Sequence, residues 1–126
     1  MNHKTVSTNK APKALGPYTQ ATVHNGVVYC SGQIALDPIT NEVVQGGVKE
    51  QTHQVLKNLS EVLKEAGSGL DKVLKCTIFL DDMREYPNVN EVYGTYFSDN
   101  LPAREAVAVE ALPKYVKVEI SCIAYI

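Results

Sequence analysis

The fold is decided by the final residues of the chain, VKVEISCIAYI (116–126). Alternate positions in this segment are apolar, as expected of a β-strand whose successive side chains point to opposite faces of a sheet. The residues on one face are all apolar: Val116, Val118, Ile120, Cys122, Ala124 and Ile126. Beyond Glu119 the other face is largely apolar too, so we expect helices to cover one face and a second copy of the chain to cover the other.

A second strand-like run, residues 104–109, follows Pro102 and begins with Arg104. Its residues are mostly small or β-branched, which favours a strand. Arg104 and Arg84 are the chain's only arginines. An arginine that enters an apolar strand either reaches back to solvent or meets an anion, and its planar fork fits a carboxylate through two hydrogen bonds. We therefore hypothesise that Arg104 holds a small carboxylate ligand.

Nearer the N-terminus, Asn25 and Gly26 separate two strand-like runs, residues 18–24 and 27–32. Asn-Gly is a strong hairpin signal because a type I′ turn requires positive φ at both central residues. The sequence therefore predicts a β-hairpin. Gly32, at the end of its second strand, has two readings: it lets another group approach the backbone closely, or it marks a bulge.

Two segments have the period of amphipathic helices. The first covers residues 48–66 and ends at Gly67, which supplies a left-handed cap; the second begins at Pro87. A strand is predicted between them, over residues 72–80. The order hairpin, helix, strand, helix, strand, strand fits several α+β folds, and the length favours one domain over residues 1–126.

The composition excludes several classes of protein. The sequence has 44% hydrophobic and 21% charged residues, which is typical of globular proteins, and no apolar run is long enough to span a bilayer. A net charge of -2 provides no field that attracts nucleic acid. Because no targeting segment is evident, we expect a cytoplasmic protein, with an organellar form that has lost such a segment as the alternative.

The sequence also gives no indication of a metal site. Cys30, Cys76 and Cys122 lie far apart in apolar runs, which favours buried thiols in a reducing compartment over a disulfide framework. The ligand spacings of zinc sites are absent. The paired Asp81 and Asp82 are interpreted as the end of a strand and the cap of the segment after it.

Five short motifs go further than these patterns. They occur in this order: Ala14-Leu15-Gly16-Pro17-Tyr18, Ser31-Gly32-Gln33-Ile34, Asn90-Glu91-Val92-Tyr93, Pro102-Ala103-Arg104, and Leu112-Pro113 followed by Val118-Glu119-Ile120. Together they resemble the RidA/YjgF family of reactive intermediate deaminases, and the resemblance covers nearly the whole chain.

That resemblance implies a chorismate-mutase-like α+β domain with a mixed β-sheet and two helices packed on one face. It also implies a homotrimer whose sheets face inward, with a ligand cleft between neighbouring subunits. The implied activity is that of a 2-iminobutanoate/2-iminopropanoate deaminase. Such an enzyme hydrolyses enamine and imine acids, such as 2-aminoacrylate and 2-iminobutyrate, to a 2-keto acid and ammonia without a cofactor.

The resemblance also assigns roles to residues. Arg104, Glu119 and Tyr18 are the catalytic candidates, with Arg104 binding the substrate carboxylate and Glu119 positioning or activating water. The substrate-binding candidates, which line the cleft together with Tyr18, are Ser31, Gly32, Asn90 and the backbone of Ala106.

Three positions depart from the family pattern. Ala106 stands where many members have cysteine, although a backbone contact survives that change. Glu105 replaces a small residue, and strand alternation should point it away from Arg104. Ala35 replaces a common proline, a change that should loosen its loop.

Three other functions are alternatives, the simplest of which is a pure scaffold, which a closed, ligand-free subunit interface would favour. A regulator that binds a small carboxylate without converting it would use the same Arg104 site. RNA cleavage or translation inhibition is disfavoured by the acidic balance and the shortage of arginine. Without the family motifs, Glu119 reads as a surface residue. In a cleft its pKa would be raised by desolvation and lowered by Arg104 nearby.

Overall fold

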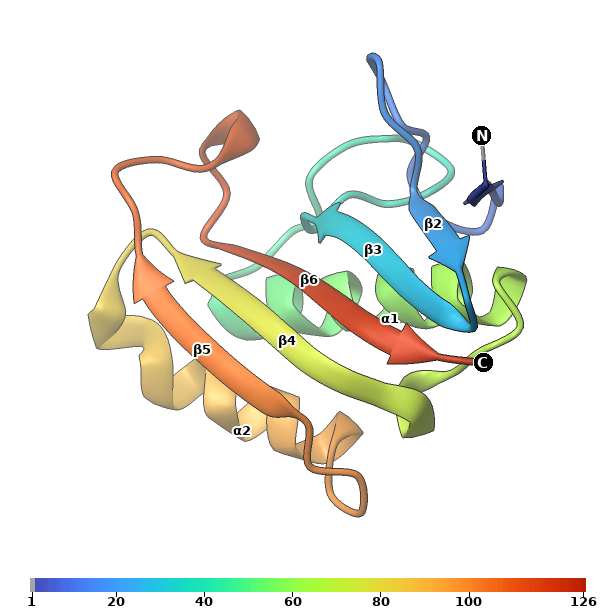
Figure 1. Cartoon of the computed structure of the whole chain (residues 1–126). Coiled ribbons are helices and arrows are strands. Elements are labelled where there is room, and N and C mark those ends of the chain that lie inside the picture. The colour runs from blue at the N-terminus through green and yellow to red at the C-terminus, as the bar shows by residue number, and fades with distance from the viewer. Residues whose placement is uncertain (1) are drawn as a thin grey trace.

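The structure is a computed structural model that describes residues 2–126 as one mixed sheet with two α-helices behind it (Figure 1). The strands run in the order β1-β2-β3-β6-β4-β5 across the sheet. The elements, in chain order, are β1 (Lys4–Val6), β2 (Ala21–His24), β3 (Val27–Gln33), α1 (Val48–Glu65), β4 (Val73–Leu80), α2 (Tyr86–Tyr96), β5 (Ala103–Ala108) and β6 (Val118–Tyr125). All neighbouring pairs are antiparallel except β4 and β5, which α2 connects as a parallel crossover. The predicted α+β class is confirmed.

Strand β6 lies in the interior of the sheet, between β3 and β4. This position explains its apolar pattern, because a strand with neighbours on both sides is covered more completely than an edge strand. The strand is shorter than the predicted 116–126. Val116 is buried in the preceding loop, whereas Ile126 follows the strand and is 51% exposed.

The core lies between the sheet and the two helices. Helix α1 buries Leu56, Leu59 and Leu63 against Ile78 of β4 and Ile120 of β6. The residue after its C-cap, Gly67, has φ +88°, so the predicted left-handed cap is confirmed. Helix α2 buries Val89, Val92 and Tyr93 and has Pro87 in its first turn, as predicted. Among the described residues, no helix is long and apolar enough to cross a membrane.

The other face of the sheet carries apolar side chains that no element of the described chain covers. Tyr29 pairs with Ile123, and Phe79 lies between Glu119 and Val107 in the register of neighbouring strands. Tyr29 and Val107 are each about half exposed. We call this surface the open face. The expectation that the two helices cover one face only is confirmed, and coverage of the open face by a second copy stays a prediction.

The turn of the first hairpin gives a test of stability. Asn25 and Gly26 have φ values of 51° and 76°, as a type I′ turn requires. An alanine at Gly26 would be strained, and Gly26→Ala should lower the free energy of unfolding by about 1 kcal/mol. Gly94, in the middle of α2, has ordinary φ and open space for a Cβ, so Gly94→Ala should raise it by ~0.5–1 kcal/mol. Urea titration measures both, and a Gly26→Ala variant at least as stable as the wild type would contradict the described turn.

Candidate active site

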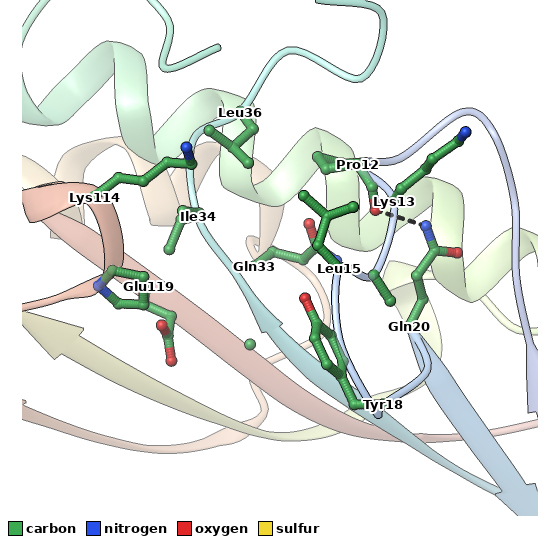
Figure 2. Close-up of a pocket in the computed structure, with 13 residues that line it drawn as sticks. Pro12, Lys13, Leu15, Tyr18, Gln20, Gln33, Ile34, Leu36, Lys114 and Glu119 are labelled. Atoms are coloured by element: carbon green, nitrogen blue, oxygen red, sulfur yellow. Dashed lines mark hydrogen bonds between the residues drawn. The ribbon is translucent and has the colours of Figure 1, made fainter. Parts of the chain in front are cut away.

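A pocket of about 260 Å³ opens between the loop that precedes β2, the end of β3 and the loop that leads into β6 (Figure 2). We call it the glutamate pocket. Three of the predicted site residues line it: Tyr18, Gly32 and Glu119. Figure 2 shows Tyr18 and Glu119 on opposite sides of the pocket. The remaining lining residues are Pro12, Lys13, Ala14, Leu15, Gln20, Gln33, Ile34, Leu36, Pro113 and Lys114.

Gln20 builds one wall of this pocket from the inside. Its side chain is buried, and its Oε1 accepts a hydrogen bond from the Thr8 N–H at 2.7 Å. Its Nε2 donates to the carbonyls of Thr8 and Pro12 at 3.0 and 2.8 Å, the second of which is drawn in Figure 2. A buried amide with these partners fixes the loop that it holds. The hydrogen bonds of Gln20 therefore fix the loop that leads to Tyr18.

Gly32 lets the Glu119 carboxylate lie against the backbone of β3. The register between β3 and β6 shifts between Cys30 and Gln33, so a bulge is present. A Cβ built on Gly32 would stand 2.5 Å from Oε2 of Glu119, and its φ lies outside the left-handed region. Both readings of this glycine are therefore confirmed, and space rather than backbone conformation requires it.

The Glu119 carboxyl is half buried, and burial raises its pKa above the ordinary glutamate value of 4.5. Within residues 2–126, desolvation is the only cause of this pKa shift. The lowering effect that we expected from Arg104 does not act within one copy. A carboxyl with a raised pKa exchanges a proton nearer to neutral pH, which is the property that a general acid or base needs.

The Ser31 hydroxyl and N–H both form hydrogen bonds within the chain. Its hydroxyl donates to the Thr19 carbonyl at 2.6 Å, and its N–H donates to the Gln20 carbonyl at 2.9 Å. Both bonds tie the end of β3 to the residues before β2. Ser31 does not line the glutamate pocket, so a direct role in binding stays a prediction.

Arg104 lies in a different environment, on β5 at the edge of the sheet. It pairs in register with Cys76, a fully buried core residue, and so faces the helix side. One Nη donates to the Tyr86 hydroxyl, and the guanidinium carbon lies 4.8 Å from the centre of the Tyr93 ring. None of the salt bridges found in residues 2–126 involves Arg104. The groups that contact the Arg104 guanidinium are therefore uncharged and do not neutralise its positive charge.

The two remaining predicted residues lie on the elements that carry or face Arg104. Asn90 follows Tyr86 by four positions and precedes Tyr93 by three, so all three share one face of α2. Ala106 follows Arg104 on the same face of β5 and packs against the core. We call Arg104, Tyr86, Asn90, Tyr93 and Ala106 the arginine group.

Sequence reasoning did not single out Tyr86 or Tyr93 as neighbours of Arg104. The spacing of Tyr86, Asn90 and Tyr93, which are four and three residues apart, could have indicated that they share one face of the predicted second helix. The sequence did predict that Glu105 points away from Arg104. The structure confirms it, because Glu105 forms a salt bridge with Lys75 at 2.9 Å on the open face.

The sheet separates the arginine group from the glutamate pocket. Glu119 pairs with Phe79, whose side chain belongs to the open face, whereas Arg104 pairs with Cys76 on the helix face. One copy of the chain therefore does not bring Arg104 and Glu119 together. A cleft that uses both side chains needs a second copy.

The three cysteines are buried thiols, as predicted. They form a row across the sheet, because Cys122 pairs with both Cys30 and Cys76. Burial raises the pKa of Cys76, and a hydrogen bond with Cys30 together with burial raises the pKa of Cys122. Among the described residues, no group of three or more His, Cys, Asp or Glu side chains is arranged to hold a metal ion.

Comparison with known proteins connects this geometry to a family. The model of a family described as endoribonuclease L-PSP matches residues 8–126. The mouse 2-iminobutanoate/2-iminopropanoate deaminase is 50% identical over 121 residues, covering 96% of this chain and 90% of the mouse protein. Among solved structures, yeast Mmf1 superposes with a TM-score of 0.95 at 41% identity, covering 98% of each chain. Escherichia coli TdcF with bound serine gives 0.93 at 36% identity, again covering 98% of each chain.

Proposed function

Because this chain belongs to the RidA/YjgF family, we propose that it is a hydrolytic deaminase of small imine and enamine acids, a 2-iminobutanoate/2-iminopropanoate deaminase. The observation that carries the proposal is the Glu119 carboxyl, half buried in a pocket beside Tyr18 with a raised pKa. The 50% identity with a mouse protein named for this activity supports it. The reaction needs a held carboxylate, a water molecule and a proton carrier, all of which protein side chains can manage.

In the proposed reaction, water adds to the imine and ammonia is then eliminated. A water oxygen attacks the imine carbon, the π electrons move to nitrogen, and Glu119 takes a proton from the water as the new C–O bond forms. Glu119 returns this proton to the nitrogen, a second proton comes from the new hydroxyl group, the C–N bond breaks, and ammonia leaves with the electron pair of that bond. Loss of that hydroxyl proton leaves the carbonyl of the 2-keto acid. An enamine substrate first gains a proton on carbon to become the imine.

Arg104 supplies orientation in this proposal. Its guanidinium, which no carboxylate of residues 2–126 neutralises, binds the carboxylate of the substrate. Holding that end fixes the imine carbon relative to the water, and pre-positioning of reactants can lower a barrier by about 7 kcal/mol in well-aligned cases. In this proposal Asn90, on the same face of α2 as Tyr86, and the backbone of Ala106, two residues after Arg104 on β5, would line the same end of the cleft. The TdcF relative binds serine, which also carries a carboxylate beside a nitrogen.

The proposal requires a homo-oligomer, and we propose the trimer that the family resemblance implies. The open face has the uncovered apolar side chains that an interface between copies would bury. The arginine group of one copy would then meet the glutamate pocket of the next. Light scattering on the purified protein measures the mass of the assembly directly.

A coupled assay tests the activity. A threonine dehydratase releases 2-iminobutyrate, and the rate of 2-ketobutyrate formation is followed with and without this protein. We expect this protein to raise the rate above that of spontaneous hydrolysis. Equal rates in both arms, together with binding of 2-ketobutyrate, would support a carboxylate-binding regulator instead. Degradation of RNA by the same preparation would support the activity named in the family description.

A further inference from the structure

We propose that the Tyr86 hydroxyl is the positioning residue for Arg104, and that it fixes the guanidinium in the orientation that receives the substrate carboxylate. This inference rests on the proposed function, because it concerns the same site. It adds a residue that neither the strand pattern of the sequence nor its short motifs identify.

The contacts of Arg104 orient its side chain but leave most of its hydrogen-bond donors available. A guanidinium has five N–H donors on a planar fork, and the described chain engages Arg104 through one hydrogen bond, to the Tyr86 hydroxyl. The aromatic rings of Tyr86 and Tyr93 lie 5.4 and 4.8 Å from the guanidinium carbon. Aromatic rings at these distances attract a cation without neutralising its charge. The side chain is thus oriented, while most of its donors stay available for an anion.

The Tyr86 hydroxyl restricts the rotation of the Arg104 guanidinium. Rings alone leave a guanidinium free to rotate over their faces, whereas a hydrogen bond to one Nη fixes its rotation. When a hydroxyl accepts a bond from a cation, its own proton must point elsewhere and becomes a stronger donor. Tyr86 therefore holds Arg104 and also presents an O–H beside it, where a carboxylate can accept it.

Tyr86 lies at a rigid position in the fold. It is the first residue of α2 and follows the 3₁₀ turn Met83–Glu85, in which Asp82 caps the N–H of Arg84 at 2.9 Å. Pro87 then fixes the first turn of the helix. The hydroxyl is consequently attached to a rigid helix start and not to a mobile loop, as a positioning group requires.

Tyr86→Phe tests the inference, because it removes only the hydroxyl. We expect KM for 2-iminobutyrate to rise on the order of tenfold, with kcat within about twofold of the wild type, because Arg104 still orients the acid once it is bound and the lost bond weakens binding in ground and transition states alike. The matched control is Tyr96→Phe, the same change on the same helix. The Tyr96 hydroxyl bonds Nδ1 of His53 at 3.0 Å and does not contact Arg104.

A binding measurement keeps this test separate from the activity. Calorimetric titration with 2-ketobutyrate should give a Kd about tenfold weaker for Tyr86→Phe and unchanged for Tyr96→Phe. If the wild type binds the keto acid but shows no turnover, the deaminase proposal fails and the role of Tyr86 is still measured. Equal Kd and KM for Tyr86→Phe and wild type would overturn the inference. So would a fall in kcat at unchanged KM, which would place the hydroxyl in the chemical step.

Discussion

Arg104→Ala is expected to reduce kcat/KM for 2-iminobutyrate by ~10³-fold or more, while the fold and the assembly persist. The loss combines the charge-assisted bonds to the carboxylate with the orientation that they impose. Arg104→Lys should recover little of it, because an ammonium keeps the charge but cannot form the planar pair of bonds. Steady-state kinetics in the coupled assay and light scattering measure the two quantities.

The chain contains a matched control for this substitution. Arg84, the other arginine, is exposed and forms a salt bridge with Asp82 at 2.8 Å. Arg84→Ala should leave kcat/KM unchanged. If Arg84→Ala and Arg104→Ala lowered activity equally, a general loss of positive charge would explain both results, and the carboxylate site at Arg104 would be rejected.

Glu119→Gln is expected to lower kcat by about 10²- to 10⁴-fold, the usual contribution of a positioned proton carrier. Glutamine keeps the size of the side chain, so the space beside Gly32 stays filled and the pocket keeps its shape. The control is Glu61→Gln on α1, whose carboxylate contacts Lys64 away from the glutamate pocket. Unchanged turnover in Glu119→Gln would remove the carboxyl from the mechanism.

The pH dependence has a defined sign. Glu119 acts as a base when it is deprotonated, and burial raises its pKa, so kcat/KM should fall on the acid side at a pH above the ordinary value of 4.5. Glu119→Gln should lose this acid limb. The pH dependence of stability has the opposite sign. Because the pKa of Glu119 is higher in the folded than in the unfolded chain, its contribution to the free energy of unfolding is present below the unfolded pKa and is lost as pH rises through the folded pKa. The variant should therefore be no less stable than wild type at neutral pH.

Local sequence signals predicted much of the fold. The Asn25-Gly26 turn, the left-handed glycine that ends α1 and the alternation in β6 each depend on residues that are close in sequence. Such signals carry their own physical cause, either a φ value or a period. The ends of strands were the exception: β2 begins at Ala21 and not at residue 18, and pairing with β3 and β4 rather than hydrophobicity decides where β6 begins and ends.

The site was predictable only in part. Gly32 was recognised as a place of close approach, but the approaching group comes from β6 and depends on a register shift. The contact of Tyr86 with Arg104 depends on how α2 is rotated over the sheet, which tertiary packing determines. Gln20 gave no signal, since a buried glutamine is identified only by the carbonyls that it holds. Long-range contacts of this kind have no local pattern.

The separation of Arg104 and Glu119 by the sheet has a consequence for mixtures of inactive proteins. If each cleft takes its arginine from one copy and its glutamate from another, Arg104→Ala and Glu119→Gln damage different halves of it. Unfolding the two inactive variants together and refolding them should regenerate intact clefts, roughly a quarter of the total when copies combine at random. Recovered turnover in the hybrid would identify a site shared between copies, and a hybrid as inactive as its parents would contradict a cleft that takes the two residues from different copies.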